Sequence, residues 1–189
     1  MTGAVRGKRP PRSYAPGRLL RLLASDMPGH QLEQESPGKG RFLPRDGGPV
    51  IEVVERVDRR FLGHTEIAQF RMASSGADRG HAHLTIRHTG RMSRQGVAVH
   101  VSSGDGAIRR LAERIATAES FTTAAMTLDF TRFEVVRVDG EWSSTIELMG
   151  ASFVSLALPP MRSYVRLHAD QRQALVDTLT ALNNQLEAG

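Results

Sequence analysis

The sequence predicts an α+β fold in which an antiparallel sheet carries helices packed on one face. Segments with alternating apolar and polar residues follow one another from residue 50 to residue 101 and again from residue 128 to residue 167. Each series ends in a segment with the apolar spacing of a helix. Runs of short strands followed by helices are typical of layered α+β domains. We therefore expect a single domain over residues 16–189.

The clearest local signal is a hairpin that begins near Leu128. Asp139 and Gly140 favour a two-residue turn, because the central residues of such a turn must reach positive φ. The residues after this turn alternate in polarity, which predicts a half-buried strand over 141–149. Its apolar side is formed by Trp142, Ile146 and Leu148, with Ser144 between them.

Two more strands and a helix complete the C-terminal part. The apolar run 150–158 predicts a buried strand that ends at Pro159 and Pro160, and the segment 161–167 alternates again. Asp170 and Gln173 have the spacing of a capping box, which predicts a helix that starts there. The helix and the strands are expected to share a core made of Trp142, Ile146, Leu148, Phe153, Leu156, Leu175, Leu179 and Leu182.

The N-terminal part is expected to start with a disordered basic tail over residues 1–15, rich in Arg, Lys, Pro and Gly. A short leucine-rich helix is predicted from Pro16 to Met27, and a loop or extended connector over 28–49. The predicted elements after it are strands over 50–60, 62–73, 81–88 and 97–101, then a helix capped by Asp105 that runs to about residue 118. The segments 50–118 and 128–187 therefore both read as four strands followed by a helix, which predicts an internal duplication.

Composition limits the functional classes. The chain has 25 basic and 20 acidic residues, a net charge of +5, and only Lys8 and Lys39 as lysines. This excess permits an anionic ligand, nucleic acid or an acidic protein as partner and requires none of them. The absence of cysteine excludes disulfides and thiolate chemistry. No apolar run is long enough to span a membrane and no signal peptide is recognised, so we expect a cytoplasmic protein.

One resemblance comes from the last third of the chain. The run Glu147-Leu-Met-Gly-Ala-Ser-Phe153 and the run from Leu158-Pro-Pro-Met-Arg-Ser-Tyr164 to Gln171 resemble segments of an uncharacterised bacterial family of unknown function. This resemblance implies no activity and assigns no catalytic residue.

The sequence lacks the phosphate-loop, dinucleotide-binding, zinc-protease and serine-hydrolase motifs, and no cofactor is predicted from a motif. Histidines offer one alternative. If Leu84 pairs with Val99 in a hairpin, His83 lies opposite His100, with His81 on the same face, and three imidazoles can approach one zinc or similar ion. His64 and Glu66, two residues apart on a neighbouring strand, are a further pair suited to acid–base chemistry. The opposing interpretation is a set of polar residues on the solvent face of a sheet.

A second set suggests binding rather than catalysis. Arg162, Tyr164 and Arg166 alternate on one face of the last strand, and Arg87 joins them if both halves share one sheet. Interleaved arginine and aromatic residues on a sheet suit an anionic partner, and a solvated face is the simpler interpretation. We expect a non-enzymatic module that binds an anionic or protein partner through an arginine-rich sheet face. The alternative is a small metal-dependent, hydrolase-like enzyme that uses the histidines. The sequence does not indicate an oligomeric state.

Overall fold

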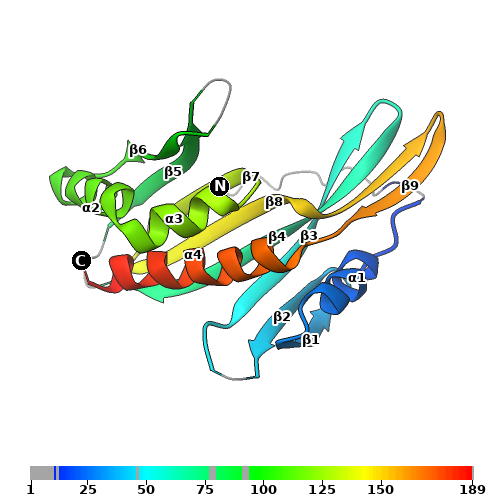
Figure 1. Ribbon diagram of the computed structural model, residues 1–189, viewed down its shortest axis with the longest axis horizontal. Coiled ribbons are helices and arrows are strands. Elements are labelled where there is room, and N and C mark those ends of the chain that lie inside the picture. Colours follow the sequence, from blue (N-terminus) through cyan, green and yellow to red (C-terminus); the bar gives the residue numbers. More distant parts are fainter. Residues whose placement is uncertain (1–10, 12, 46, 77–79, 91–93, 189) are drawn as a thin grey trace, which may run out of the picture.

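The computed structural model describes residues 11, 13–45, 47–76, 80–90 and 94–188, which form one continuous sheet with helices on it (Figure 1). The helices in this part of the chain are α1 (Arg18–Asp26), α2 (Gly106–Thr117), α3 (Glu119–Thr127) and α4 (Ala169–Glu187). Its strands are β1 (His30–Ser36), β2 (Lys39–Pro44), β3 (Ile51–Arg60), β4 (Gly63–Ser75), β5 (Ala82–Thr89), β6 (Gly96–Ser103), β7 (Phe130–Val138), β8 (Glu141–Ala157) and β9 (Pro160–Val165). The predicted α+β class is confirmed.

The strands are antiparallel and lie in the order β1-β2-β3-β4-β8-β7-β5-β6. The long strand β8 is central, because it pairs with β4 along most of its length and changes its other partner on the way. Its first half pairs with β7, and its second half, residues 152–157, pairs with β9. The sheet therefore has a junction at the middle of β8, where β7 ends and β9 begins.

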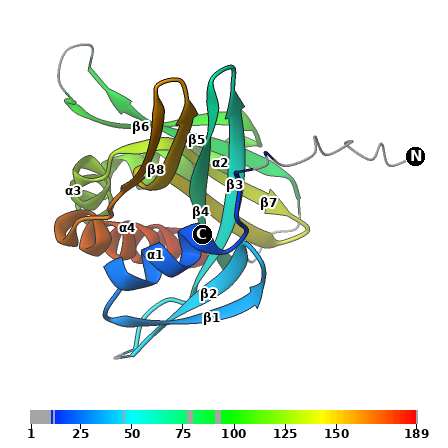
Figure 2. The same cartoon turned by 90° about the vertical axis from the view of Figure 1, so that its right-hand side faces the viewer.

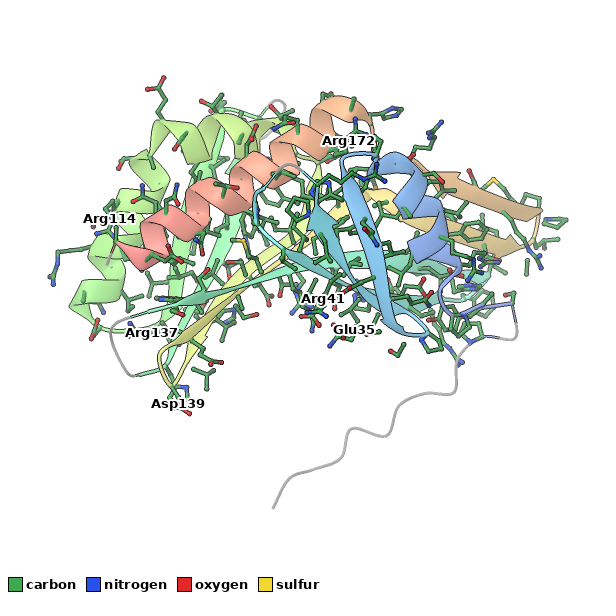
Figure 3. The ribbon with its side chains drawn as sticks, turned by 90° about the horizontal axis from the view of Figure 1, so that it is seen from below. Glu35, Arg41, Arg114, Arg137, Asp139 and Arg172 are labelled. Carbon is green, nitrogen blue, oxygen red and sulfur yellow. The ribbon has the colours of Figure 1, made fainter. Side chains whose placement is uncertain are left out.

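Helices cover one face of this sheet, with α4 running along it beside α3 (Figure 1). The core lies between the two layers, where Phe70, Phe133 and Ile146 are fully buried. Side chains at the alternate positions point to the opposite face, which no helix covers in the described part of the chain. Figure 3 shows Glu35 and Arg41 on this side, away from α4, where Arg41 Nε lies 2.9 Å from Glu35 Oε1. We call this side the open face.

Several local predictions are confirmed. The helix α1 forms within the predicted range and buries Leu19, Leu20 and Leu23. Asp105 caps α2, since its carboxylate accepts hydrogen bonds from the backbone N–H groups of Ala107 and Ile108. Of the residues expected to share a core, all are buried except Leu156, which is partly exposed because it points to the open face near the end of β8.

Other local predictions were wrong. Residues 28–49 were expected to be a connector, but most of them form the hairpin β1–β2, in which Leu32 pairs with the fully buried Phe42. The alternating signal there is carried by few apolar residues, and Gly38 at φ +81° makes the turn. The segment 119–127 had no predicted structure and forms α3, which buries Phe121 and Ala125.

Two predictions for the C-terminal part were also wrong: the division of one strand into two, and the capping box at the start of the last helix. The predicted strands 141–149 and 150–158 are one strand, β8. The predicted capping box does not form. The N-cap of α4 is His168, without a side-chain hydrogen bond, and the Gln173 amide donates instead to Asp177, one turn further along the helix.

The duplication stays a prediction. In the structure, the segment 50–118 contains β3 to β6 and α2, whereas the segment 128–187 contains three strands, β7 to β9, and α4. Residues 1–10 and 12 of the predicted tail lie outside the described residues. Near its end, the Tyr14 hydroxyl donates to Glu55 of β3 over 2.9 Å. No helix in the described ranges is long and apolar enough to cross a membrane.

Candidate functional site

The predicted arginine–tyrosine strand is β9, but two of its residues are bound to α1. The Tyr164 hydroxyl donates to Asp26 Oδ2 over 2.7 Å, and Arg166 donates from Nε and Nη2 to Asp26 Oδ1 over 3.0 and 2.9 Å. Tyr164 thus lies on the helix-covered side of the sheet. Tyr164 is therefore partly covered by α1, whereas Arg166 follows β9 and keeps 67% of its side chain exposed. Ligand binding by these two residues stays a prediction.

The other two predicted binding residues lie far from each other. Arg162 is exposed at the start of β9, opposite Ser155 on the helix-covered side. Arg87 is exposed on β5, which is separated from β8 by β7. Since β9 pairs with the far half of β8, the sheet does not bring Arg87 to the other three residues (Figure 1).

The histidine prediction failed at the hairpin register. Leu84 pairs with Val101 rather than with Val99, so the turn between β5 and β6 is two residues longer than predicted. A shift by two residues keeps the apolar sides of both strands together, and alternation alone therefore cannot distinguish the two registers.

The predicted metal ligands are not assembled by this pairing. His100 lies opposite Thr85 instead of His83, and His81 precedes β5. His83 Nε2 lies 4.0 Å from a carboxylate oxygen of Glu134 on β7. Within the described residues, no group of three His, Asp or Glu is placed so that it could hold a metal ion.

A cavity of about 470 Å³ instead opens on the open face, at the junction where β8 changes partner. We call it the open-face cleft. Its polar lining is rich in arginine, with Arg56 and Arg60 from β3 and Arg132 from β7, and it contains Asp58 and Glu147 as acids. A neighbouring hollow of about 340 Å³ shares Thr131 and Arg132 with the cleft and is lined by the predicted residue Arg87.

The cleft lies beside a bulge at the centre of β8, and Leu148 and Met149 of this bulge line it. Gln69 pairs with Glu147 and Ile67 with Ser152, so residues 148–151 of β8 lie opposite the single residue Ala68. Gly150 sits in this bulge, where an added Cβ would lie 3.1 Å from the backbone oxygen of Arg166. The predicted break at residue 150 therefore marks a real irregularity, although the strand continues through it.

Glu147 is the centre of the polar side of the cleft, and its side chain is only 2% exposed. Arg56 donates to it from Nε over 3.0 Å and from Nη2 over 2.7 Å, and the Gln69 amide donates over 2.7 Å. Arg132 Nη1 lies 3.6 Å away, on the neighbouring strand. Burial by itself would raise the pKa of Glu147, but the hydrogen bonds from Arg56 and Gln69 and the charges of both arginines lower it overall.

The other wall of the cleft is apolar. Ile67, Val154 and Val165 present side chains from three adjacent strands, and Met149 projects from the bulge with 54% of its surface exposed. A cleft with three arginines in its polar lining and an aliphatic surface on the other wall can bind a molecule that has both an anionic and an apolar part.

The match to a known family covers these residues. Residues 25–186 match the model of a family described as a protein of unknown function (DUF3156). The chain belongs to the DUF3156 family. The resemblance in the last third of the chain is thus confirmed and extends over most of the sequence, from the end of α1 to the end of α4. Neither a curated protein nor a solved structure is significantly similar to this DUF3156 chain.

A second polar cluster of the DUF3156 chain lies on the helix-covered side. His64 and Glu66 are buried, as a pair, with His64 Nε2 3.2 Å from Glu66 Oε1. The hydroxyl of Ser13 lies 3.5 Å from His64 Nδ1, and Arg18 of α1 forms an ion pair with Glu66. Ser13 and His64 line a cavity of about 540 Å³ together with Arg162. Sequence reasoning found the His–Glu pair but gave no reason to add Ser13, which is distant in sequence and lies within the predicted tail.

Sequence reasoning also missed the open-face cleft. Its polar residues lie in strands whose residues alternate in polarity, at the positions where charged side chains usually contact only solvent. These residues are Arg56, Gln69, Arg132 and Glu147. Their convergence depends on the strand order and on the bulge in β8, and neither is encoded in a local pattern.

Proposed function

We propose that this DUF3156 protein is a binding module whose open-face cleft holds a small anionic ligand with an apolar part. The observation that carries the proposal is the convergence of Arg56 and Arg132 on the buried Glu147, directly beside an aliphatic wall. The proposal keeps the arginine-rich sheet face expected from the sequence and moves it from β9 to β3 and β7.

The arginines have hydrogen-bond donors to spare. A guanidinium has five N–H donors. Glu147 takes two of those of Arg56, through Nε and Nη2, and the side chain of Arg56 remains 39% exposed. Arg132 is 43% exposed and donates from Nη2 to Glu134 over 2.6 Å. A ligand carboxylate or phosphate can use the remaining donors while Glu147 keeps the guanidinium of Arg56 in place.

The size and charge of the cleft favour a small molecule over a polymer. Its volume of about 470 Å³ lies in the range of small-molecule sites. The lining has three arginines and two acids, so its net charge is +1. Nucleic-acid affinity needs several phosphate contacts, and the acids beside Arg56 and Arg60 would oppose them. The cleft therefore favours a small anionic ligand over a nucleic acid.

The experiment is calorimetric titration with straight-chain carboxylates of increasing length, compared with the alcohols of the same length. We expect affinity to rise with chain length and to be lost in the alcohols. Arg132→Gln should weaken binding by about tenfold or more, which corresponds to about 1.4 kcal/mol. The matched control is Arg109→Gln, since Arg109 is exposed on α2, on the other side of the sheet. Equal affinity of acids and alcohols, or equal loss in both variants, would contradict the proposal.

A second candidate function is favoured by the Ser13–His64–Glu66 chain, which has the order nucleophile, base and carboxylate. In this function the Ser13 hydroxyl attacks an ester carbonyl and His64 takes its proton. His64 then delivers that proton to the leaving alkoxide, and water releases the acid from the acyl-serine. Ester hydrolysis that is abolished in Ser13→Ala and His64→Gln, with unchanged thermal stability, would support it. Equal hydrolysis by wild type and Ser13→Ala would exclude it.

A further inference from the structure

Two hairpins of the sheet end in exposed apolar residues. We call the β3–β4 turn with its flanks, residues 59–63, and the β8–β9 turn with its flanks, residues 156–162, the hairpin tips. Phe61 is 101% exposed and Leu158 is 69% exposed, while Leu62 and Met161 are each 45% exposed. These four are half of the eight large hydrophobic residues that are exposed in the described part of the chain. Such clustering distinguishes the tips from scattered surface hydrophobes.

The structure holds the two hairpin tips side by side. Gly63 pairs with Leu156, and the N–H of Ala157 donates to the carbonyl oxygen of Leu62 over 2.7 Å. Figures 1 and 2 show the two hairpins projecting together from one end of the molecule. The apolar side chains therefore form one projecting edge.

Basic residues surround this edge. Arg59, Arg60 and Arg162 are exposed next to the apolar residues. The acidic residue closest in sequence to either tip is Asp58, which precedes the β3–β4 tip. Its carboxylate lies 2.8 Å from Arg60 Nη2. With Asp58 included, the edge carries a net charge of +2.

We propose that the hairpin tips dock the protein on an anionic lipid bilayer, with Phe61, Leu62, Leu158 and Met161 entering the interface. Apolar side chains gain from transfer into the acyl boundary, and adjacent arginines gain from anionic headgroups. Neither signal alone gives stable attachment, and the tips present both. Arg60 lines both the open-face cleft and this edge, but the ligand proposal for the cleft does not depend on the docking, since Arg56, Arg132 and Glu147 are not part of the hairpin tips.

The shape of the surface favours a bilayer over a protein. A specific protein interface buries about 800 Å² on each partner and needs a complementary surface. The hairpin tips project from the end of the sheet (Figures 1 and 2), and four large apolar side chains are exposed on them. A fluid bilayer accepts a projecting edge without a matching shape.

Vesicle cosedimentation of the full chain tests the proposal, with vesicles of phosphatidylcholine alone and of phosphatidylcholine mixed with phosphatidylglycerol. We expect sedimentation with the mixed vesicles, and its reduction by high salt. The variant Phe61→Ser/Leu158→Ser should reduce the bound fraction by about tenfold at the same lipid concentration. The matched control is Val138→Ser, because Val138 is 46% exposed and lies at the β7–β8 turn, away from the tips.

Insertion has its own readout. Trp142 is the only tryptophan and is buried. Phe61→Trp therefore adds a second fluorophore, and its emission is obtained by subtracting the spectrum of the wild type from that of the variant. Its emission should shift to the blue with mixed vesicles and should be quenched by brominated lipid. No sedimentation, no shift, or equal loss in Val138→Ser overturns the proposal.

Two further outcomes also overturn it. One is binding that disappears when residues 1–12, with Arg6, Lys8, Arg9 and Arg12, are removed and that is insensitive to the tip substitutions. The other is a wild-type dimer in sedimentation velocity that the tip substitutions convert to a monomer, without vesicle binding in either form. The first would assign the attraction to the basic N-terminal sequence, and the second would make the tips a contact between copies of the chain.

Discussion

Asp26 accepts a hydrogen bond from the Tyr164 hydroxyl over 2.7 Å, although 138 residues separate them in sequence. The same carboxylate accepts two bonds from Arg166 and one from the backbone N–H of Leu167. Asp26 ends α1, and the other three residues lead from β9 into α4. Its side chain is 2% exposed, so one carboxylate fixes the N-terminal helix against the C-terminal part of the fold.

Asp26→Asn should destabilise the protein by about 2–3 kcal/mol, because an amide keeps the shape but loses the charge-assisted bonds. We do not expect the larger cost of an isolated buried charge, since 67% of the Arg166 side chain is exposed and water can solvate it. Urea unfolding measures the change. Asp177→Asn, at an exposed position of α4, should stay within about 0.5 kcal/mol. A similar result for both variants would mean that the Asp26 contacts contribute little.

Glu147 should make stability depend on pH in the acid range. Its pKa is lowered in the folded protein, so the folded state binds this proton less readily than the unfolded state. The resulting stabilisation is present above the ordinary carboxyl pKa of about 4.3 and is lost as the pH falls through the lower folded value.

The test compares wild type with Glu147→Gln by urea unfolding between about pH 7 and about pH 3. The free energy of unfolding of the wild type should fall more steeply with decreasing pH than that of the variant, which cannot titrate at this position. The lowered pKa of Asp26 has causes that do not involve Glu147, so this carboxylate contributes equally to both proteins. Parallel curves would show that Glu147 is not held as a stabilising carboxylate.

The sequence predicted the elements better than their arrangement. Alternation in polarity and helical spacing located most strands and three of the four described helices, because those signals are local. Register and strand order are set by contacts between distant segments. Leu84 illustrates this, because pairing with Val99 or with Val101 leaves it on the same face, and only the second pairing is found.

The same limit explains the outcome for the site residues. The residues around Tyr164 alternate in polarity, and this pattern does not show whether its side chain faces solvent or a covering helix. In the structure α1 covers it. Arg56 and Glu147 are 91 residues apart and meet only after β4 has been placed between their strands. The composition of the open face could be predicted from alternation, whereas the cleft on it could not.

The helix α4 should contribute through its buried leucines. Leu179 is fully buried, and Leu179→Ala should cost about 2–5 kcal/mol, since it removes buried methyl groups and leaves a cavity. Leu156 serves as the comparison, because it was expected in the core and is partly exposed in the structure. Leu156→Ala should cost less than half as much in thermal or urea unfolding. Equal losses would place both side chains in the same core and contradict the observed difference in burial.

Gly63 should be intolerant of any side chain, because β4 approaches β8 too closely at this point. An added Cβ would lie 2.1 Å from the carbonyl oxygen of Ser155 and 3.0 Å from Cα of Leu156. Both are backbone atoms of the paired strand, so relief requires the hairpin to separate from β8. We expect Gly63→Ala to destabilise the protein by about 1–3 kcal/mol, the usual cost of overpacking. The matched control is Gly29→Ala, where an added Cβ has no heavy atom within 4 Å. This substitution should cost less than about 0.5 kcal/mol.

Amide hydrogen exchange gives a local measurement of the same effect. Protection of Ala157, whose N–H donates to Leu62, should fall in Gly63→Ala and stay unchanged in Gly29→Ala. Retained protection in Gly63→Ala would mean that the two strands are not as close as the structure places them.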